Sequence, residues 1–469
     1  MGPLSPPDLD RLNVEARRLL ATVGVVLDHD EVRQALLRAG AAEGTDGRVR
    51  LPAGMVRDAL AAAPKAVVLA SVAGERTALT AAGPTVFWSG NALHLTDRNG
   101  RREMTSALLA DLVRVLDTLE HVHAPVAPSI ADFPPHSRDF VGFRILAENS
   151  RKHLRPCVYT PAGPLTIYEM AQVLLGGRSF DEYPIFSLGY TALSPLRWSS
   201  TALELFRVTA GKRIPMMVNA EPLAGATAPV TLAGSVVQGH AEALSGFVIL
   251  QTLEPGRPCI YNLGFAHPFD MRSLISLTGA VECGLHAAAG AQLAQHLDLP
   301  SASWMSTESS VPDAQAGLEK TMTGLQHALA GVNIIWGIGQ LDSQQALSME
   351  MAVIDNDIAG QLRRAQQGIP LTAETLALDL ITEMAPTGRF MMADHTLAHY
   401  REQVHYPAVV FRGQRGRWEA EGAKDMVERA HDVVADILRR DREPMLTDDQ
   451  QRELLALQDR RLTELAAGG

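Results

Sequence analysis

The chain has 469 residues, of which 46% are hydrophobic and 20% are charged, and its formal net charge is −11. This balance indicates a globular protein with a large core and excludes a disordered chain. The acidic charge and the absence of a basic cluster argue against a nucleic acid partner. Three cysteines, at positions 157, 259 and 283, are too widely spaced for a CxxC pair, which is typical of a reducing cytoplasm.

The N-terminal sequence and the most hydrophobic segment both argue against membrane targeting. Met1–Asp8 lacks the basic region and the apolar stretch of a signal peptide. Val230 to Leu253 is long and apolar, but it includes Gln238, His240 and Glu242, a set of polar residues that is rare in a membrane span. We therefore expect this segment to form a buried core helix, and we expect a cytoplasmic protein without membrane association.

Short helices and strands are mixed in the first hundred residues. Leu9 to Val23 has the apolar stripe of an amphipathic helix, which Gly24 ends. Val67–Ser71 and Thr85–Ser89 are rich in β-branched and aromatic residues, which is typical of strands. We interpret residues 1–104 as an N-terminal α+β cap and residues 105–469 as one integrated catalytic unit.

From Thr105 onwards, strand-like and helix-like segments alternate, a pattern that predicts right-handed βαβ units and a parallel sheet. The expected strands are Val122–Ala127, Pro156–Thr160, Pro184–Tyr190, Ile214–Asn219, Cys259–Gly264, Ser301–Met305 and Asn333–Gly339. The expected helices between them are Asp139–Ser150, Leu165–Leu175, Ser199–Ala210, Val230–Leu253, Arg272–His296 and Ala314–Ala330.

Seven expected strands in this order predict an α/β fold of the TIM (β/α)8 barrel class. The eighth strand is only weakly marked, and we place it near Phe390–Met392. An open doubly wound sheet is the alternative. The segment beyond Asp425 is charged and has a helical pattern, so we expect C-terminal helices that pack on the outside.

The stretch from Glu221 to Thr231 is the candidate centre of a functional site. It joins the apolar strand Ile214–Asn219 to the long core helix, Gly225 permits a turn with positive φ, and Thr227 is a candidate N-cap. Backbone N–H groups and the positive end of the helix dipole would then face the space above the strand. A carboxylate at such a corner is typical of an α/β active site, but an ordinary βα turn with a solvated Glu221 fits equally well.

Aromatic residues make up only 5% of the chain, so their positions are informative. Tyr190, Trp304 and Trp336 lie at or near the ends of expected strands, and Asn262 is near the end of another. Aromatic faces near a carboxylate can hold a quaternary ammonium group by cation–π attraction, worth roughly 0.5–2 kcal/mol per contact. Simple packing of a barrel mouth by aromatic residues is the alternative.

Two further candidates come from loops. Glu308 lies in a stretch that brings two carboxylates and two hydroxyls to the end of an expected strand, where Asp313 also fits as the N-cap of the next helix. His395 follows an apolar run that ends in Asp394, so it could reach the site, whereas His399 one turn later fits the surface of a helix.

Metal and nucleotide motifs are incomplete. His121 and His123 resemble the strand-borne His-x-His of metal hydrolases, but the later strand ends carry no further His or Asp ligands. Gly337-Ile338-Gly339 lacks the third glycine of a dinucleotide-binding loop. We therefore predict no metal site and no nucleotide site.

Several motifs together resemble those of one family, the trimethylamine methyltransferase superfamily, in the branch without pyrrolysine that includes glycine betaine methyltransferases. The resemblance covers nearly the whole chain. It rests on Gly90–Arg102, Ser194-Pro195-Leu196, Gly225–Gly234, Ala241-Glu242, Pro255–Pro258, Pro312–Gly317 and Gly388–Tyr400. It implies a TIM barrel whose members move a methyl group from an amine to the Co(I) corrinoid of a separate small protein.

The missing pyrrolysine favours a quaternary amine, such as a betaine, over a tertiary amine as the implied substrate. On this reading the catalytic candidates are Glu221, Glu308 and His395, and the substrate-binding candidates are Tyr190, Asn262, Trp304 and Trp336. Gly225, Thr227 and Thr231 are candidates for a rim that faces the corrinoid. We also expect the chain to form a homo-oligomer. The alternatives are a barrel methyltransferase with a folate acceptor and a betaine-binding barrel without catalytic activity.

Overall fold

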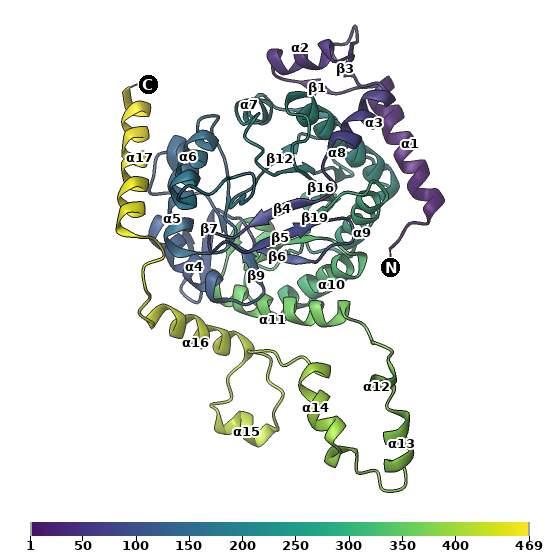
Figure 1. Ribbon diagram of the computed structural model, residues 1–469, viewed down its shortest axis with the longest axis vertical. Helices are drawn as coiled ribbons and strands as arrows, with labels where there is room; N and C mark the ends of the chain where they lie inside the picture. The colour runs from purple at the N-terminus through teal and green to yellow at the C-terminus, as the bar shows by residue number, and fades with distance from the viewer. Residues whose placement is uncertain (1, 468–469) are drawn as a thin grey trace.

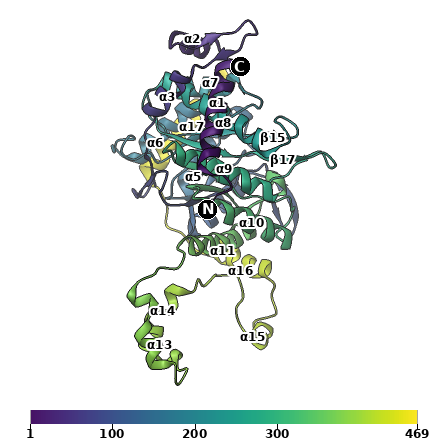
Figure 2. The same ribbon diagram turned by 90° about the vertical axis from the view of Figure 1, so that its right-hand side faces the viewer.

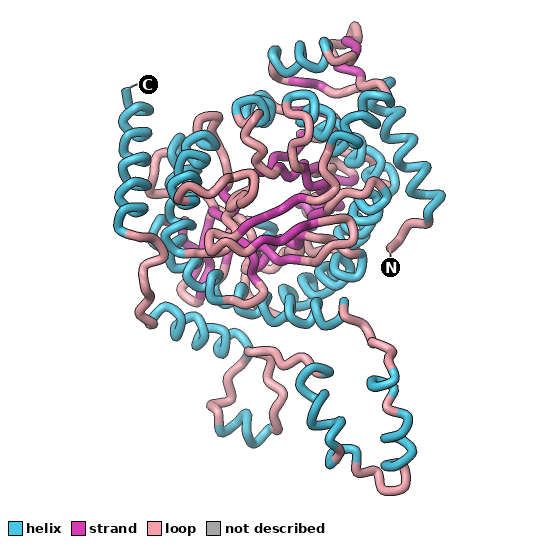
Figure 3. Tube along the Cα trace, viewed as in Figure 1, coloured by secondary structure: helices cyan, strands magenta, loops and turns pink. Residues whose placement is uncertain are grey.

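The computed structural model describes residues 2–467, and its centre is a parallel β-sheet surrounded by helices (Figures 1 and 3). The sheet has seven strands, and every adjacent pair runs parallel. This confirms the predicted α/β class. In spatial order the strands are β12 (Leu188–Ala192), β14 (Met216–Ala220), β16 (Cys259–Gly264), β19 (Ser301–Trp304), β20 (Ile334–Ile338), β6 (Val86–Ser89) and β9 (Val122–Ala124).

Short additional pairings extend the sheet from β9 back towards β12. Pro125, which has no backbone N–H, separates β9 from β10 (Val126–Ala127). β10 pairs in parallel with β11 (Arg155–Pro156). Leu154, just before β11, forms a parallel bridge with Phe186, just before β12. The two edge strands of the sheet are therefore linked through β10 and β11.

One long helix connects each of these strands to the next, as the alternation predicts, and one more follows β20. The helices are α4 (Ser106–Thr118), α5 (Arg138–Asn149), α6 (Gly163–Leu175), α7 (Ser200–Val208), α8 (Leu232–Leu253), α9 (Val281–His296), α10 (Ala314–Ala330) and α11 (Met349–Gln366). Most of α8 is buried, as expected of a core helix. Within residues 2–467, no helix combines the length and the apolar character that a membrane span needs.

The predicted place of the weakly marked strand is wrong. Phe390–Met392 forms the short 3-10 helix η3, whereas β6 completes the sheet, with Val86 paired to Ile334 and Phe87 paired to Val122. The sequence marks β6 as a strand but does not show which sheet it joins, because its partners lie far away along the chain. The sheet therefore includes a strand from residues 1–104, the segment that the sequence analysis separated as an N-terminal cap.

The other N-terminal elements are distributed over the body. They are α1 (Pro6–Thr22), β1 (Val26–Leu27), α2 (Asp30–Arg38), β2 (Ala42–Glu43), β3 (Val49–Arg50), α3 (Ala53–Ala62), β4 (Val67–Ala70), β5 (Arg76–Leu79), β7 (His94–Asp97) and β8 (Gly100–Glu103). α1 and α3 pack on α8, and β1 pairs with β13 (Arg197–Trp198). The β4–β5 hairpin packs on Val86, at the amino-terminal end of β6.

Alternating side chains give the molecule two apolar cores. The larger core lies between the sheet and the helices, and it includes Val218 and Tyr261. The smaller one, which we name the inner core, is lined by the opposite faces of the same strands. It contains Val67, Leu69, Leu79, Val86, Trp88, Ala124, Val126, Met217, Ile260, Phe265, Ala302, Trp304, Ile334 and Trp336.

Two C-terminal helices pack on the body, as the sequence predicts. α16 (Met426–Arg439) packs on α11 and α4, and α17 (Asp448–Ala467) packs on α6. Between α11 and α16 the chain leaves the body and returns, carrying α12 (Ala373–Leu376), α13 (Leu378–Met384), η3 and α14 (Asp394–Gln403), followed by α15 (Arg415–Ala420). We name residues 369–404 the arm, which extends away from the sheet in Figures 1 and 2.

A buried ion pair fastens the turn that follows β20. Nζ of Lys320 lies 2.5 Å from Asp355 Oδ2 and also donates to the carbonyls of Gly337 and Gln340 at 2.9 and 2.8 Å. Both charged side chains are fully buried. Burial raises the pKa of Asp355 to about 6 and lowers the pKa of Lys320, so each charge depends on the other. Gly339 N–H donates to the same Asp355 oxygen at 2.7 Å.

We predict that Lys320→Met strongly destabilises the fold, because Asp355 would remain buried without its cation. We expect the free energy of unfolding to fall by about 3–5 kcal/mol, observed as a lower midpoint of urea unfolding. The control is Arg18→Ala, which removes an ion pair on α1 whose side chains are 71% and 45% exposed and which should change the midpoint little. An unchanged midpoint for Lys320→Met would show that the pair does not hold this turn.

Candidate active site

Three polar side chains form a ladder across neighbouring strands near their carboxyl ends. Thr191, Asn219 and Asn262 are partners in register on β12, β14 and β16, so their side chains share one face. Nδ2 of Asn262 donates to Oδ1 of Asn219 at 2.9 Å, and Nδ2 of Asn219 donates to Oγ1 of Thr191 at 3.3 Å. Asn262 was predicted from its position, whereas Thr191 and Asn219 are additions from the structure.

The structure does not bring Tyr190 into this ladder. Tyr190 is in register with Val218, whose side chain belongs to the larger core between the sheet and the helices, and the tyrosine packs partly against that same core. A shift of one residue along a strand moves a side chain to the opposite face of the sheet. Thr191, the next residue, occupies the position that the sequence reading gave to Tyr190.

Trp304 and Trp336, both predicted site residues, are brought together in the inner core. They are partners in register on β19 and β20, and they are 8% and 6% exposed. Phe265 packs between them, with ring-centre distances of 4.4 Å to Trp304 and 6.2 Å to Trp336. Trp88 lies 5.2 Å from Trp336. These rings form an aromatic lining inside the sheet. Of its members, the sequence predicts only the two tryptophans, from β19 and β20.

An arginine that the sequence reading missed lies beside this aromatic lining. The guanidinium carbon of Arg155, in β11, is 5.1 Å from the centre of the Trp336 ring, and the side chain is only 4% exposed. Nη1 donates to the backbone carbonyls of Pro156 and Ser187 at 2.8 and 3.2 Å. No clear signal in the sequence marks it, because Arg155 follows Arg151 and Lys152 and precedes the expected strand Pro156–Thr160.

Glu221 follows β14 directly and lies beside a buried histidine. Its Oε1 is 3.9 Å from Nε2 of His267, and 38% of the glutamate side chain is exposed, against 1% for the histidine. Burial by the surrounding protein raises the pKa of Glu221 to about 7, and burial lowers the pKa of His267 to about 3. A neutral imidazole therefore faces a carboxyl group that is only partly ionised near neutral pH.

The loop after Glu221 is held by a small sheet of its own. β15 (Leu223–Ala224) pairs with β17 (His267–Asp270), which pairs in turn with β18 (Ile275–Ser276). Figure 2 shows the segments of β15 and β17 projecting from one side of the body. This pairing is the reason that His267, distant in sequence, reaches Glu221.

The structure corrects one detail of the predicted rim. The N-cap of α8 is Thr231 and not Thr227, whose hydroxyl instead accepts a hydrogen bond from the N–H of Leu223 at 2.9 Å. Gly225 has the expected positive φ, 100°. Gly225, Thr227 and Thr231 therefore lie in or directly after the tight loop between β14 and α8, where Gly225 is the residue that needs left-handed backbone freedom.

Glu308 has a structural role in the fold. Its Oε1 accepts hydrogen bonds from the N–H and the hydroxyl of Thr278 and from the N–H of Gly279. Asp313 accepts from the N–H of Ala316 at 2.9 Å as the N-cap of α10. These contacts fasten the loop before α9 to the loop before α10. The N-cap at Asp313 is the alternative role that the sequence analysis gave to this loop.

His395 lies far from the aromatic lining. It is part of α14 on the arm, where its Nε2 is 3.1 Å from the carbonyl of Glu374 and its ring centre is 4.5 Å from that of His399. Figures 1 and 2 place α14 outside the body. Within one chain, His395 therefore does not approach Glu221.

The histidines singled out as possible metal ligands have other surroundings. Nδ1 of His123 accepts a hydrogen bond from the N–H of Phe87 at 3.1 Å, and the ring of His121 lies 6.5 Å from that of His405. Across residues 2–467, no group of three or more His, Cys, Asp or Glu side chains is arranged to hold a metal ion.

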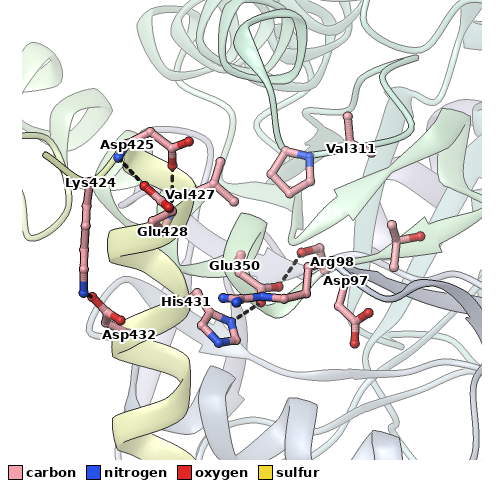
Figure 4. Close-up of a pocket in the computed structure, with 13 residues that line it drawn as sticks. Asp97, Arg98, Val311, Glu350, Lys424, Asp425, Val427, Glu428, His431 and Asp432 are labelled. Carbon is pink, nitrogen blue, oxygen red and sulfur yellow. Dashed lines mark hydrogen bonds and ion pairs between the residues drawn. The ribbon is translucent and has the colours of Figure 1, made fainter. Parts of the chain in front are cut away.

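A cavity of about 550 Å³ lies outside the inner core, between the β7–β8 hairpin and α16 (Figure 4). Its polar groups largely satisfy one another. Nδ1 of His431 is 2.9 Å from Oε1 of Glu350, and Asp425 forms a capping box with Glu428. None of the predicted site residues lines this cavity. Its contacts attach α16 to the start of α11, and we do not assign it to the active site.

Comparisons with known proteins agree on one family. The model of the family described as trimethylamine methyltransferase (MTTB) matches residues 1–466. The chain is 30% identical over 446 residues to trimethylamine methyltransferase MttB of Desulfitobacterium hafniense, covering 92% of this chain and 88% of the relative. It is 26% identical to a glycine betaine methyltransferase of the same species, covering 91% and 90%.

A solved structure resembles the fold. The crystal structure of the monomethylamine methyltransferase MtmB of Methanosarcina barkeri matches with a TM-score of 0.56 and 11% identity, covering 93% of this chain and 88% of the other. That likeness supports the α/β fold alone. The match of the family model over almost the entire length, together with the relatives, shows that the chain belongs to the trimethylamine methyltransferase family.

Proposed function

We propose that this protein moves a methyl group from a small quaternary amine of the betaine type to the Co(I) corrinoid of a separate protein. The observation that carries the proposal is the aromatic lining in a chain of the methyltransferase family, with Trp304 5.6 Å from the ring of His267, which neighbours Glu221. The site offers a desolvated, aromatic environment for a cation, with a carboxyl group at its edge.

We infer that the strands close into a (β/α)8 barrel whose carboxyl-terminal mouth holds this site. The support is the continuous chain of pairings: β6 pairs with β9, β10 pairs with β11, Leu154 bridges to Phe186 before β12, and β20 pairs back to β6. Parallel strands place Asn219, Asn262 and Trp304 near the same end, where barrel enzymes bind their substrates.

The choice of a quaternary amine rests on the site and not on sequence identity. The trimethylamine methyltransferase is slightly more similar to this chain in sequence than the glycine betaine methyltransferase is. The sequence contains no pyrrolysine. Tryptophan and phenylalanine faces suit a cation that cannot donate hydrogen bonds. Glu221 adds a negative charge when ionised, and the ladder of Thr191, Asn219 and Asn262 leaves few free polar groups to bind an amine N–H.

The chain supplies no evident methyl acceptor of its own. Its three cysteines are free, and burial raises the pKa of all three thiols, that of Cys259 to about 12. None is therefore a thiolate near neutral pH. A reduced corrinoid would supply the nucleophile, so the chain's task is to bind the amine, orient one methyl group towards the mouth and exclude water. The free cysteines also suit the cytoplasmic location that we propose.

The mouth offers a surface for such a partner. The β15–β18 loops carry apolar residues that face solvent, with Val230 71% exposed, Met271 65% exposed and Leu274 68% exposed. Gly225, Thr227 and Thr231 lie within or beside these loops. We propose that this rim contacts the corrinoid protein, since an exposed apolar patch commonly marks a protein interface.

We also propose that the chain forms a homo-oligomer through the arm. Arg364 of α11 donates to the carbonyl of Gln403 at the end of the arm, and just after the arm the backbone N–H groups of Ala408, Val409 and Val410 donate to Asp357. The arm exposes large apolar side chains, including Leu371 at 77% and Met391 at 88%. Exposed apolar side chains on this scale favour burial against another surface. Obligate interfaces between copies of a chain are more apolar than transient interfaces, so they suit such a segment.

A second copy is a better occupant than the corrinoid protein, because Figure 2 places α13 and α14 on the side opposite to β15 and β17. The body of a neighbouring copy offers a matching surface on α10, where Leu318 is 65% exposed and Met322 is 46% exposed. Within the described chain, the main contacts of α14 are with η3, which also belongs to the arm.

The reaction is tested by mixing the protein with free Co(I) cobalamin and single amines. We expect the cobalamin to be methylated with glycine betaine and not with trimethylamine. The absorbance of the cobalamin measures this methylation. A tetrahydrofolate acceptor in a parallel reaction tests the folate alternative. Methyl transfer from trimethylamine alone would overturn the choice of substrate. Binding of betaine without transfer to either acceptor would favour the binding-protein alternative.

The pKa of Glu221 predicts the pH dependence of binding. A bound cation favours the carboxylate, so affinity should rise as pH increases through about 7, by about tenfold between pH 6 and pH 8 if only the ionised form binds. Isothermal titration calorimetry with a betaine measures this. Glu221→Gln should remove the dependence, whereas Glu308→Gln, which alters the loop contacts with Thr278 and Gly279, should retain it. A pH-independent affinity of the unaltered protein would exclude Glu221 from the site.

The arm is tested by light scattering after size exclusion. We expect the 50.6 kDa chain to elute as an oligomer and the double variant Met391→Asp, Met392→Asp to elute as a monomer, because the charges would face an apolar partner. Thr382→Asp adds a charge to α13 at a polar position and serves as the control. A monomeric unaltered chain, or a double variant that retains its oligomeric state, would contradict the proposal.

A further inference from the structure

A cation that has no anionic partner within residues 2–467 lies against the inner core, beside Trp336. Arg155 is 4% exposed, and no carboxylate of the described chain forms an ion pair with it. Its Nη1 bonds to two backbone carbonyls, but Nε is buried without a hydrogen-bond partner. Burying an unpaired charge is costly, and proteins rarely do so unless a ligand completes the pair.

Two more unpaired donors belong to the same lining. The indole N–H groups of Trp304 and Trp336 are buried, and neither has an acceptor. The Arg155 guanidinium carbon lies 5.1 Å from the Trp336 ring centre, and the two tryptophans are partners in register on adjacent strands. The aromatic lining thus presents three unpaired N–H donors. Buried donors normally find partners, so this imbalance points to a missing acceptor.

We infer that this donor set binds the carboxylate of the proposed betaine and that Arg155 is the residue that makes the site specific for it. The inference rests on the proposed function and deepens it. A guanidinium presents N–H groups in a planar fork that matches the two oxygens of a carboxylate. The indole N–H groups add donors that an amine without a carboxylate would leave unpaired.

The position of Arg155 along the barrel gives the substrate a direction. The guanidinium lies next to Gly189 and Met217, since a Cβ at Gly189 would be 2.7 Å from Nη2 of Arg155 and 2.9 Å from Cβ of Met217. Asn219 lies two residues further along β14 and Glu221 lies two residues beyond that, each step being roughly 7 Å along an extended chain. A carboxylate at Arg155 therefore leaves the ammonium group nearer to the mouth.

This direction suits methyl transfer. The non-reacting carboxylate points into the barrel, and the N-methyl groups point towards the mouth, the end from which an external acceptor would approach. Gly189 is required here, because any side chain at this position would displace the guanidinium. A neutral or purely cationic amine would have no group to occupy the deep end of the site.

A purely structural role for Arg155 makes a different prediction. Its bond to the Ser187 carbonyl ties β11 to the start of β12, where the backbone pairing is limited to the Leu154–Phe186 bridge. Loss of such a tie would lower stability and would weaken all ligands to a similar degree. Loss of a carboxylate contact would weaken only the ligands that carry a carboxylate.

The experiment compares two ligands of similar size, glycine betaine and tetramethylammonium, by titration calorimetry and by quenching of tryptophan fluorescence. We expect the unaltered protein to prefer betaine by at least about tenfold, because a site built for polar groups rejects analogues that lack them. Arg155→Met should abolish this preference while the affinity for tetramethylammonium changes little. Arg155→Lys should restore part of it.

Arg178→Met is the matched control. Arg178 also bonds to backbone carbonyls, those of Leu175 and Val72, and its guanidinium carbon lies 5.1 Å from the Tyr183 ring centre, but it lies outside the inner core. The Arg178→Met variant should keep the preference for betaine over tetramethylammonium. Equal binding of both ligands by the unaltered protein would overturn the inference, as would an equal loss of both in Arg155→Met. Binding is measured without any corrinoid, so a failure of methyl transfer remains distinguishable from a failure of this inference.

Discussion

The register of the parallel sheet is the constraint on which the site depends. Side chains alternate between the two faces of each strand, so one residue of register decides whether a group faces the helices or the interior. The register aligns Thr191 with Asn219 and Asn219 with Asn262, and it aligns Trp304 with Trp336. Pro125 and the short β11 leave a weakly paired region, where Arg155 both bridges the strands and enters the interior.

Few charged side chains lie inside this sheet. Lys320 and Asp355 neutralise each other beneath the turn after β20, and Glu221 lies where burial keeps it only partly ionised near neutral pH. The histidine beside it is held neutral by burial. The reaction that we propose takes its nucleophile from an external reagent, so the part played by this interior is to bind and orient the cation.

The molecule divides into a well-packed body and an arm with little internal support. Asp357 fastens the segment that follows the arm, and large apolar side chains of the arm are exposed. Short isolated helices gain too little from their own hydrogen bonds to remain stable in water, so their stability must come from packing against another surface. The motif around His395, which the resemblance to the family singles out, lies on this arm and outside the interior of the sheet, and in the assembly that we propose it would face a second copy.

The sequence by itself determined the periodic features: the alternation of strands and helices, the core character of Leu232–Leu253, the turn at Gly225 and the family, since each depends on neighbouring residues or on motifs. It also placed Asn262, Trp304 and Trp336 at strand ends. Only the tertiary structure decided that β6 completes the sheet, that Thr191 and not Tyr190 faces the interior, that Glu308 fastens two loops and that Arg155 lies against Trp336. These outcomes depend on pairings between residues far apart in the chain, and local periodicity carries no information about which distant strand, in which register, becomes the neighbour.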